Sequence, residues 1–290
     1  MIRETETARI RKLDLGRARQ RELLAFAERH RERYRSSAPF PHIVLDGFFP
    51  DAVLDDVLTE LPAIEHQESR HFYAAKNRRL TYDVDRMGPT MAGLMIDLNS
   101  AAFCSFLETL TGIDGLIPDA SLAGAGFQET GRGGYLKIHA DFNRHERLRL
   151  DRRLNLLIYL NKDWREEWGG ELLLSDPRLK QFTRIVPTFN RTLIFSVTDS
   201  AFHGVPDPIQ CPEGVTRKAL ALYYYTNGRP AGEVRWRRST RSDYRRRPGE
   251  TFEHGTGRLR EIPALLLDRA RGLVDRSKRK LASRRSREIT

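Results

Sequence analysis

Three residues of this chain have the types and the spacing to hold a metal ion: His139, Asp141 and His203. In an extended strand the side chains at positions i and i+2 leave the same face, so His139 and Asp141 can bind one ion from a single strand end. His203 must then come from another part of the fold. Two imidazoles and one carboxylate leave coordination positions open, an arrangement that suits an ion which must also bind O2, as non-haem Fe(II) does. A structural zinc site would instead close its coordination, usually with thiolates.

Short apolar segments surround these three residues. Each segment is rich in branched or aromatic residues and is bounded by Gly, Pro, Asn or Asp, which is the pattern of a β-strand. The segments predict strands over residues 121–128, 134–138, 154–160, 171–174, 182–186, 192–197, 201–203 and 218–226. So many short strands in about one hundred residues predict a sandwich or a jelly roll. In a double-sheet jelly roll the ends of the second and seventh of these strands can meet at one mouth of the barrel, which would bring the three candidate ligands together.

Several further motifs follow one another at fixed spacing. They are YLKIHAD at 135–141, LLIYLNKDW at 156–164, GGEL at 169–172, NRTLIF at 190–195, His203, and RKALALYYY at 217–225. In order and spacing they resemble the prolyl hydroxylase branch of the Fe(II)- and 2-oxoglutarate-dependent dioxygenases, and the resemblance extends over residues 41–228. It implies a mainly β fold with flanking helices (α+β), built as a double-stranded β-helix or jelly roll. It also implies Fe(II) bound by His139, Asp141 and His203.

The same resemblance implies a site for 2-oxoglutarate. The distal carboxylate of this cosubstrate needs a basic partner, and Arg offers a planar, permanently charged fork that Lys cannot. Arg217 opens the last strand at the position of the family's anchoring basic residue, and Lys218 is its competitor. Strand alternation places Arg217 with the small Ala219 and Ala221 on one face, which leaves room for a ligand, and Lys218 on the other face. We therefore favour Arg217.

Three other residues are predicted to line the cosubstrate pocket. The family position of Tyr159 implies that its phenol donates a hydrogen bond to the same carboxylate. A tyrosine of the barrel wall whose hydroxyl is satisfied elsewhere is the alternative. Tyr135 and Asn155 are further candidates for this pocket.

The resemblance implies hydroxylation of an unactivated C–H bond, with release of succinate and CO2, in the manner of prolyl 4-hydroxylases. The implied cofactors are Fe(II), 2-oxoglutarate as cosubstrate, O2, and ascorbate as a reductant. The substrate stays open between a prolyl residue of a protein, a free amino acid, and a small metabolite or sugar derivative. A related oxygenase reaction, halogenation or desaturation, is an alternative, although Asp141 disfavours halogenation because that reaction needs the carboxylate position for halide. A catalytically silent jelly-roll binding module, recruited through a basic tail, is an alternative from another class.

The remaining histidines lie in polar stretches without a matching partner, and we interpret them as surface or locally hydrogen-bonded residues. His145 is the nearest rival, because a helix over residues 141–150 would pair it with Asp141. Five arginines argue instead for a solvated loop beside the mouth of the site. They are Arg144, Arg147, Arg149, Arg152 and Arg153.

Residues 1–40 are predicted as a helical extension, with a charged helix over 11–35, and residues 41–230 as the dioxygenase domain. The domain is expected to begin with a strand over 41–49 and a helix over 51–61 capped by Asp51. A further helix is expected over 90–111. Cys104 and Cys211 are far apart and without CxxC spacing, so free thiols are expected rather than a disulfide framework.

The excess of positive charge is concentrated in a C-terminal extension, residues 231–290. Residues 235–290 alone carry 18 Lys or Arg and 7 Asp or Glu, whereas the rest of the chain has 32 of each sign. A helix over 263–285 with one apolar and one basic face is predicted there; it could contact an anionic membrane or an acidic partner, or pack on the barrel. No recognition fold supports nucleic-acid binding. Without an apolar signal segment, we expect a cytoplasmic protein, peripheral to membranes if the tail binds them.

Overall fold

The computed structural model describes residues 17–61, 75–81, 87–119, 122, 125–230, 233, 240–247 and 250. The described elements belong to one compact unit, Met1–Gly249. Its helices are α1 (Arg17–Ser36), α2 (Asp51–Glu60), α3 (Pro89–Leu98) and α4 (Ala101–Thr111). Its strands are β1 (His42–Asp46), β2 (Ala75–Thr81), β3 (Ile117–Pro118), β4 (Gly126–Ala140), β5 (Asp151–Tyr159), β6 (Leu172–Ser175), β7 (Phe182–Ile185), β8 (Arg191–Ser196), β9 (Phe202–Val205), β10 (Arg217–Thr226) and β11 (Asp243–Tyr244).

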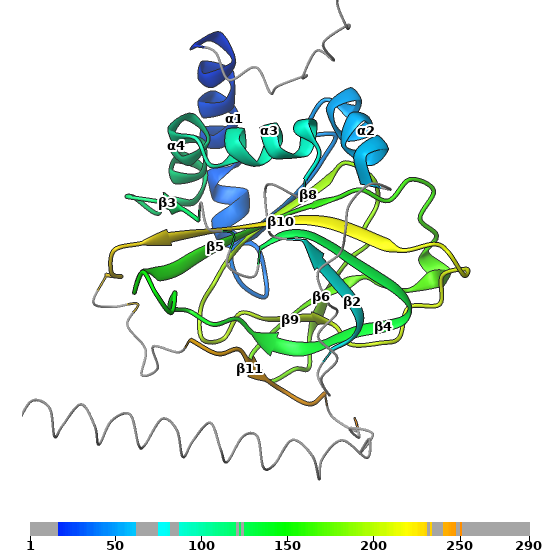
Figure 1. Cartoon of the computed structure of the whole chain (residues 1–290). Coiled ribbons are helices and arrows are strands. Elements are labelled where there is room, and N and C mark those ends of the chain that lie inside the picture. The colour runs from blue at the N-terminus through cyan, green and yellow to red at the C-terminus, as the bar shows by residue number, and fades with distance from the viewer. Residues whose placement is uncertain are drawn as a thin grey trace, which may run out of the picture. The chain divides into compact units, whose positions relative to one another are not determined.

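The strands form one curled, antiparallel sheet (Figure 1). Its order is β1-β8-β5-β10-β4-β9-β6-β7, with β2 and β11 added along β4 and β3 added along β10. The four helices lie together over one face of the sheet. This is the mainly β architecture with flanking helices that the sequence predicts.

Side chains alternate along the central strands, and this alternation separates the core from the site. Leu154, Leu156 and Ile158 of β5 pack with residues of the helices in the largest apolar core. Tyr159, the residue after Ile158, instead packs with Trp164 and residues of β8 inside the curl of the sheet. Since successive side chains of a strand leave opposite faces, one face of β5 holds the helices while the other faces the interior.

Two predictions of element boundaries were wrong. The end of the segment predicted over 121–128 and the separate strand predicted over 134–138 belong to the single strand β4, which begins at Gly126, because β2 and β10 pair with polar residues between them. The helix predicted over 90–111 is two helices. The first ends at Leu98 with Asn99 as its C-cap, and Ser100 caps the second, since its hydroxyl accepts a hydrogen bond from the backbone N–H of Phe103. Strands β2, β3 and β11 were not predicted.

Asp51 does not cap α2, contrary to the prediction. The helix begins at Asp51 itself, and the preceding Pro50 makes no side-chain cap. The Asp51 carboxylate instead accepts a hydrogen bond of 2.5 Å from Asn190 Nδ2, which ties the start of α2 to the turn before β8. The carboxylate still lies in the first turn, where the helix dipole favours negative charge.

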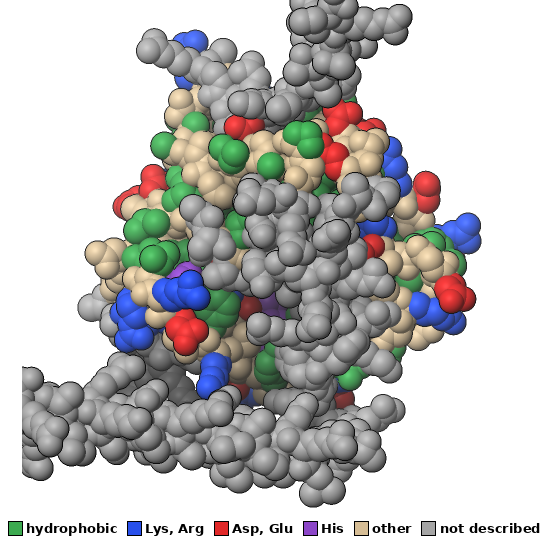
Figure 2. Space-filling view, in the orientation of Figure 1, with side chains coloured by type: hydrophobic (Ala, Val, Ile, Leu, Met, Phe, Trp, Pro, Cys, Tyr) green, Lys and Arg blue, Asp and Glu red, His purple; other side chains and the backbone are tan. Residues whose placement is uncertain are grey.

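The predicted tail helix over 263–285 and residues 1–16 lie outside the described residues. On the face shown in Figure 2, basic and acidic side chains are both present on the described surface, as expected for a segment with balanced charge. No single helix of the described segments has the length and apolarity to cross a membrane, although the bent pair α3 and α4 meets that test by length and composition alone.

Candidate metal centre

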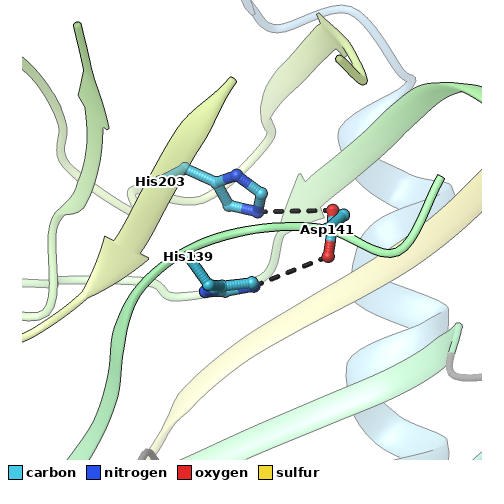
Figure 3. A group of neighbouring side chains, drawn as sticks. All are labelled: His139, Asp141 and His203. Carbon is cyan, nitrogen blue, oxygen red and sulfur yellow. Dashed lines mark ion pairs between the residues drawn. The ribbon is translucent and has the colours of Figure 1, made fainter. Parts of the chain in front are cut away.

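His139, Asp141 and His203 lie together at one end of the curled sheet. His139 is the penultimate residue of β4, Asp141 directly follows that strand, and His203 lies opposite His139 in the pairing of β4 with β9. One potential ligand atom from each residue lies within 4.8 Å of the others. His139 Nε2 is 3.5 Å from Asp141 Oδ1, and His203 Nε2 is 3.4 Å from Asp141 Oδ2 (Figure 3). This convergence has the geometry of a site for one metal ion.

The orientation of both imidazoles is fixed by the strand backbone. His139 Nδ1 is 2.8 Å from the carbonyl oxygen of Lys137, and His203 Nδ1 is 3.0 Å from that of Ala201. A carbonyl oxygen only accepts, so Nδ1 of each ring carries the proton and donates it. Nε2 is therefore the nitrogen with a free lone pair, and it faces Asp141 in both cases.

Gly204 allows β9 to come close enough to β4 for His203 to meet His139. A Cβ atom at position 204 would lie 2.8 Å from the carbonyl oxygens of both Leu136 and Lys137. Real side chains do not approach backbone oxygens that closely, so any larger residue would push the two strands apart. The glycine that follows His203 in the sequence is therefore part of what positions this histidine.

The electrostatic environment keeps Asp141 and His203 in the form that binds a metal. Burial acts to raise the pKa of Asp141, but the nearby Arg152, His203 and His139 outweigh it and hold the pKa well below its ordinary value. Burial lowers the pKa of His203 to about 4, although Asp141 opposes that shift. At neutral pH the carboxylate is thus ionised and the His203 imidazole is neutral, which are the states required of metal ligands.

Arg152 and Asn155 hold the carboxylate of Asp141 from behind. Arg152 Nη2 lies 3.0 Å from Asp141 Oδ2, and Asn155 Nδ2 donates to the same oxygen at 2.7 Å. Asn155 Oδ1 in turn accepts from Nε and Nη2 of Arg152. The ion pair and the hydrogen bond both use Oδ2, so Oδ1 is left for a metal ion. Partners of this kind orient a ligating carboxylate and tune its affinity for metal.

The prediction that Arg152 and Arg153 belong to a solvated loop was wrong. Both lie on β5 and are buried, and Arg152 is only 1% exposed. The pairing of β5 with β10 shifts register between Tyr224 and Tyr225, so that Arg153 is an extra residue in β5. Such a bulge re-aims the neighbouring side chain. In a regular strand Arg152 would share the face of Leu154; here it shares the face of Asn155.

His145, the rival ligand, lies apart from the three. Its Nδ1 accepts hydrogen bonds from the backbone N–H groups of Arg147 and Leu148, and its ring packs edge-on against Tyr225. The segment 141–150 contains no helix, so the geometry that would have paired His145 with Asp141 does not occur. Within the described segments, His139, Asp141 and His203 are the one group of three or more His, Cys, Asp or Glu residues close enough to share an ion.

A cavity of about 180 Å3 opens beside the three residues. Its walls include the predicted cosubstrate residues Tyr135, Asn155 and Arg217. Arg217 is buried, and its Nε donates at 2.7 Å to the carbonyl oxygen of Gly170. Gly170 has a φ of +79°, and a Cβ there would lie 3.1 Å from the Trp164 ring. Glycine therefore suits this position, where the backbone must turn toward Arg217.

Arg217 lines the cavity, whereas Tyr159 is buried beside Arg217 and does not line the cavity itself. The Arg217 guanidinium lies 5.0 Å from the Tyr159 ring centroid, and within the described segments it forms no ion pair with a carboxylate. The Tyr159 hydroxyl is buried and has no hydrogen-bond partner there. Burial lowers the pKa of Arg217 and raises that of Tyr159. Each shift is opposed by the interaction of the two side chains with each other. Arg217 donates through Nε to Gly170, but no carboxylate of the described segments pairs with its charge, and a buried charge without a counter-ion is costly. Arg217 therefore fits the carboxylate of a small acid.

Lys218 lies on the other face of β10, as the alternation predicts. It is half-buried, its Nζ donates at 3.2 Å to the carbonyl oxygen of Thr216, and it does not line the cavity. Ala219, which follows Arg217 on the same face, does line it.

Comparison with known proteins identifies the class of this fold and site. Residues 125–225 match the 2OG-Fe(II) oxygenase superfamily. A prolyl hydroxylase from Trichoplax adhaerens, solved in complex with a hypoxia inducible factor peptide fragment, is similar at a TM-score of 0.52 and 17% identity, over 73% of this chain and 96% of that one. A prolyl 4-hydroxylase from Phytophthora capsici is similar at a TM-score of 0.51 and 18% identity, over 71% of this chain and 65% of that one.

The resemblance predicted from the sequence is therefore confirmed. The segment that carries the His-Asp-His site matches the model of the 2OG-Fe(II) oxygenase superfamily, and the curled sheet with its helices is consistent with the jelly-roll fold of the prolyl hydroxylase structures. The superfamily implies Fe(II) and 2-oxoglutarate, and the three ligand residues fit the metal.

Replacement of Asn155 by leucine is expected to lower the affinity for Fe(II), or for Co(II) as a stable substitute, by about tenfold to a hundredfold. The change removes the neutral donor to Asp141 Oδ2 and the acceptor of Arg152, so the carboxylate is no longer held in one orientation. Isothermal titration with Co(II) measures the effect. Asn161→Leu is the matched control, because Asn161 is also a buried asparagine but bonds to the Pro187 and Lys218 backbone instead. Equal losses in the two variants would mean that Asn155 acts only through stability.

Proposed function

We propose that this protein is an Fe(II)- and 2-oxoglutarate-dependent dioxygenase that hydroxylates an unactivated C–H bond, as prolyl 4-hydroxylases do. The observation that carries the proposal is the juxtaposition of two features in one cavity. A three-residue metal site and a buried arginine without a carboxylate partner in the described segments line the same cavity, and the buried Tyr159 ring lies against that arginine. When bound, iron and 2-oxoglutarate supply the oxidising chemistry, in which O2-dependent decarboxylation to succinate and CO2 accompanies oxygen insertion into the substrate.

The protein's own residues bind and orient the reactants. His139, Asp141 and His203 hold the metal, with Asp141 kept ionised by Arg152. Arg217 pairs with the distal carboxylate of 2-oxoglutarate through its guanidinium fork, and the Tyr159 hydroxyl donates to the same group. Tyr135 forms part of the wall around the cosubstrate. No side chain is needed as a general acid or base for the removal of a hydrogen atom.

The cavity also favours a class of substrate. Arg152 lines it, and its Nη1 is buried without a hydrogen-bond partner. The guanidinium is held in place by the rings of Tyr223 and Phe142, whose centroids lie 3.3 Å and 4.5 Å from its carbon. A substrate with a carbonyl or carboxylate oxygen near the hydroxylated carbon would satisfy this nitrogen. Peptides and amino acids have such an oxygen, which supports a prolyl residue or an amino acid as substrate.

The proposal is tested first without any substrate. The whole chain with Fe(II), 2-oxoglutarate, O2 and ascorbate is expected to form succinate slowly, because the cofactors carry the decarboxylation and ascorbate supplies the electrons that a substrate would otherwise give. A screen of proline-containing peptides, free amino acids and small metabolites then seeks a faster reaction and a product heavier by one oxygen atom. A protein that binds Co(II) and 2-oxoglutarate but never forms succinate would instead be the silent binding module. A protein that binds neither would contradict both functions.

A further inference from the structure

Strand β11 brings residues from beyond the last strand of the barrel to the edge of the metal site. It pairs antiparallel with the end of β4, with Tyr244 opposite His139 and Asp243 opposite Ala140. The backbone N–H of Arg245 donates at 2.8 Å to the carbonyl oxygen of Ile138. On its other side the same stretch of β4 pairs with β9, which carries His203. The strand that holds one metal ligand is therefore flanked by β9 on one edge and by β11 on the other, and β11 lies beside β4 in Figure 1.

Tyr244 is the residue of β11 that reaches the site. Its ring centroid lies 5.1 Å from that of His139, with 31° between the ring planes. The His203 ring lies 4.6 Å from His139. Tyr244 also lines the cavity, together with Ser242. The imidazole of His139 thus lies beside two rings: that of His203, another candidate ligand, and that of Tyr244, which comes from β11 and is not a candidate ligand.

The size of the cavity makes this wall important. At about 180 Å3 the cavity is smaller than the roughly 300–1,000 Å3 typical of sites that enclose a drug-sized ligand. With a small acid already bound beside Arg217, the space cannot also enclose a second whole molecule. The substrate must present only a small group to the metal, or the wall must move.

Side chains outside the cavity fasten β11 in place. Arg247 donates to both carboxylate oxygens of Asp207, at 2.9 Å and 2.5 Å. The Arg245 guanidinium lies 5.4 Å from the Phe202 ring, on the strand that carries His203. Asp207 is 63% exposed, so this ion pair is accessible to water and weak enough to open.

We propose that Tyr244 sets the size of the group that can reach the metal, and that β11 is a strap over the cavity fastened by Arg247 and Asp207. This inference rests on the proposed function, because it assigns the substrate side of the same site. It predicts that the ring of Tyr244, rather than its hydroxyl, excludes bulky ligands. It also predicts that weakening the ion pair eases the entry of such ligands.

The test uses full-length protein loaded with Co(II) and 2-oxoglutarate, whose visible spectrum reports any further ligand. Azide is the small probe and benzimidazole the bulky one. Tyr244→Ala is expected to improve the affinity for benzimidazole relative to azide by about tenfold or more, which is the usual scale of size discrimination in a pocket. Tyr244→Phe should keep the wild-type ratio. An unchanged ratio in Tyr244→Ala would overturn the proposal.

The fastening is tested separately, which also covers the case in which Tyr244→Ala fails to fold. Asp207→Asn should speed the association of benzimidazole by about twofold to fivefold, because exposed ion pairs are weak. Asp46→Asn is the matched control: Asp46 is 64% exposed and accepts a bidentate pair from Arg191, but neither residue lines the cavity. Equal association rates of benzimidazole in Asp207→Asn and Asp46→Asn would overturn the proposal that Arg247 and Asp207 fasten β11 over the cavity. Failure of the wild type to bind Co(II) or 2-oxoglutarate would instead contradict the proposed function.

Discussion

Replacement of His203 by alanine is expected to abolish binding of Fe(II) and, with it, formation of succinate. Loss of residues that merely orient a ligand costs about 10–100-fold in metal affinity, so loss of a ligand itself should exceed that range. His139→Ala and Asp141→Ala should behave in the same way, since each removes one of three protein ligands. Iron content after dialysis, together with circular dichroism of the same samples, measures the result. Full iron occupancy in His203→Ala would overturn the assignment of the ligands.

The chain contains a close control for this experiment. His42 on β1 is also a buried strand histidine, and its Nδ1 lies 2.8 Å from the carbonyl oxygen of Phe40, two residues earlier. This is the local geometry of His139 and His203, but no carboxylate joins His42 in a metal site. His42→Ala should therefore keep its iron while it loses a similar packing contact. Loss of iron in this control would show that the losses come from unfolding.

Replacement of Arg217 by leucine is expected to raise the concentration of 2-oxoglutarate needed for half-maximal turnover by at least about tenfold, which corresponds to ~1.4 kcal/mol. The variant loses the buried guanidinium that would pair with the distal carboxylate of 2-oxoglutarate. In the described segments no protein carboxylate forms an ion pair with this guanidinium. Arg217→Lys should fall between the wild type and leucine, because it keeps the charge but not the fork. Tryptophan fluorescence quenching or uncoupled turnover gives the concentration dependence.

Lys218→Leu is the internal control for Arg217→Leu. The two residues are adjacent in sequence but lie on opposite faces of β10, and only Arg217 lines the cavity. Lys218→Leu should therefore have much the smaller effect. A larger effect of the lysine variant would place the cosubstrate on the other face of β10 and remove the proposed role of Arg217.

The parts of the site that depend on regular strand alternation could be predicted from the sequence. The pairing of His139 with Asp141 on one face needed only the two-residue period of a strand. The choice of Arg217 over Lys218 used the same period together with the family position of the anchoring basic residue. The arrival of His203 could be predicted only through the family resemblance, because sequence separation does not say which strands meet. Gly204, directly after it, is a signal that could have indicated close approach of another backbone.

The residues that were missed owe their positions to irregular or long-range structure. Arg152 was assigned to a solvated loop because a run of arginines resembles a solvated surface, and nothing in the sequence announces the bulge that turns it inward. Tyr244 lies in a stretch of mostly charged residues without the alternation of a strand, and β11 forms only because the edge of β4 is available to it. The break between α3 and α4, by contrast, was within reach, since Ser100 is a common N-cap residue.

The extra residue in β5 has a consequence for how this site could be altered by evolution or by engineering. Arg153 is one residue more than β10 pairs with in this part of β5. Its neighbours Arg152 and Leu154 lie on opposite faces of the strand because of this extra residue, whatever its chemical type. Substitutions at position 153 preserve that count. Deletion of Arg153 would remove the bulge and leave Arg152 two positions from Asn155, still on the face of the site, whereas regular pairing of β5 with Arg153 retained would turn Arg152 toward the helices. The position of the guanidinium beside Asp141 therefore depends on the bulge accompanying the extra residue, and not on the chemical type of residue 153.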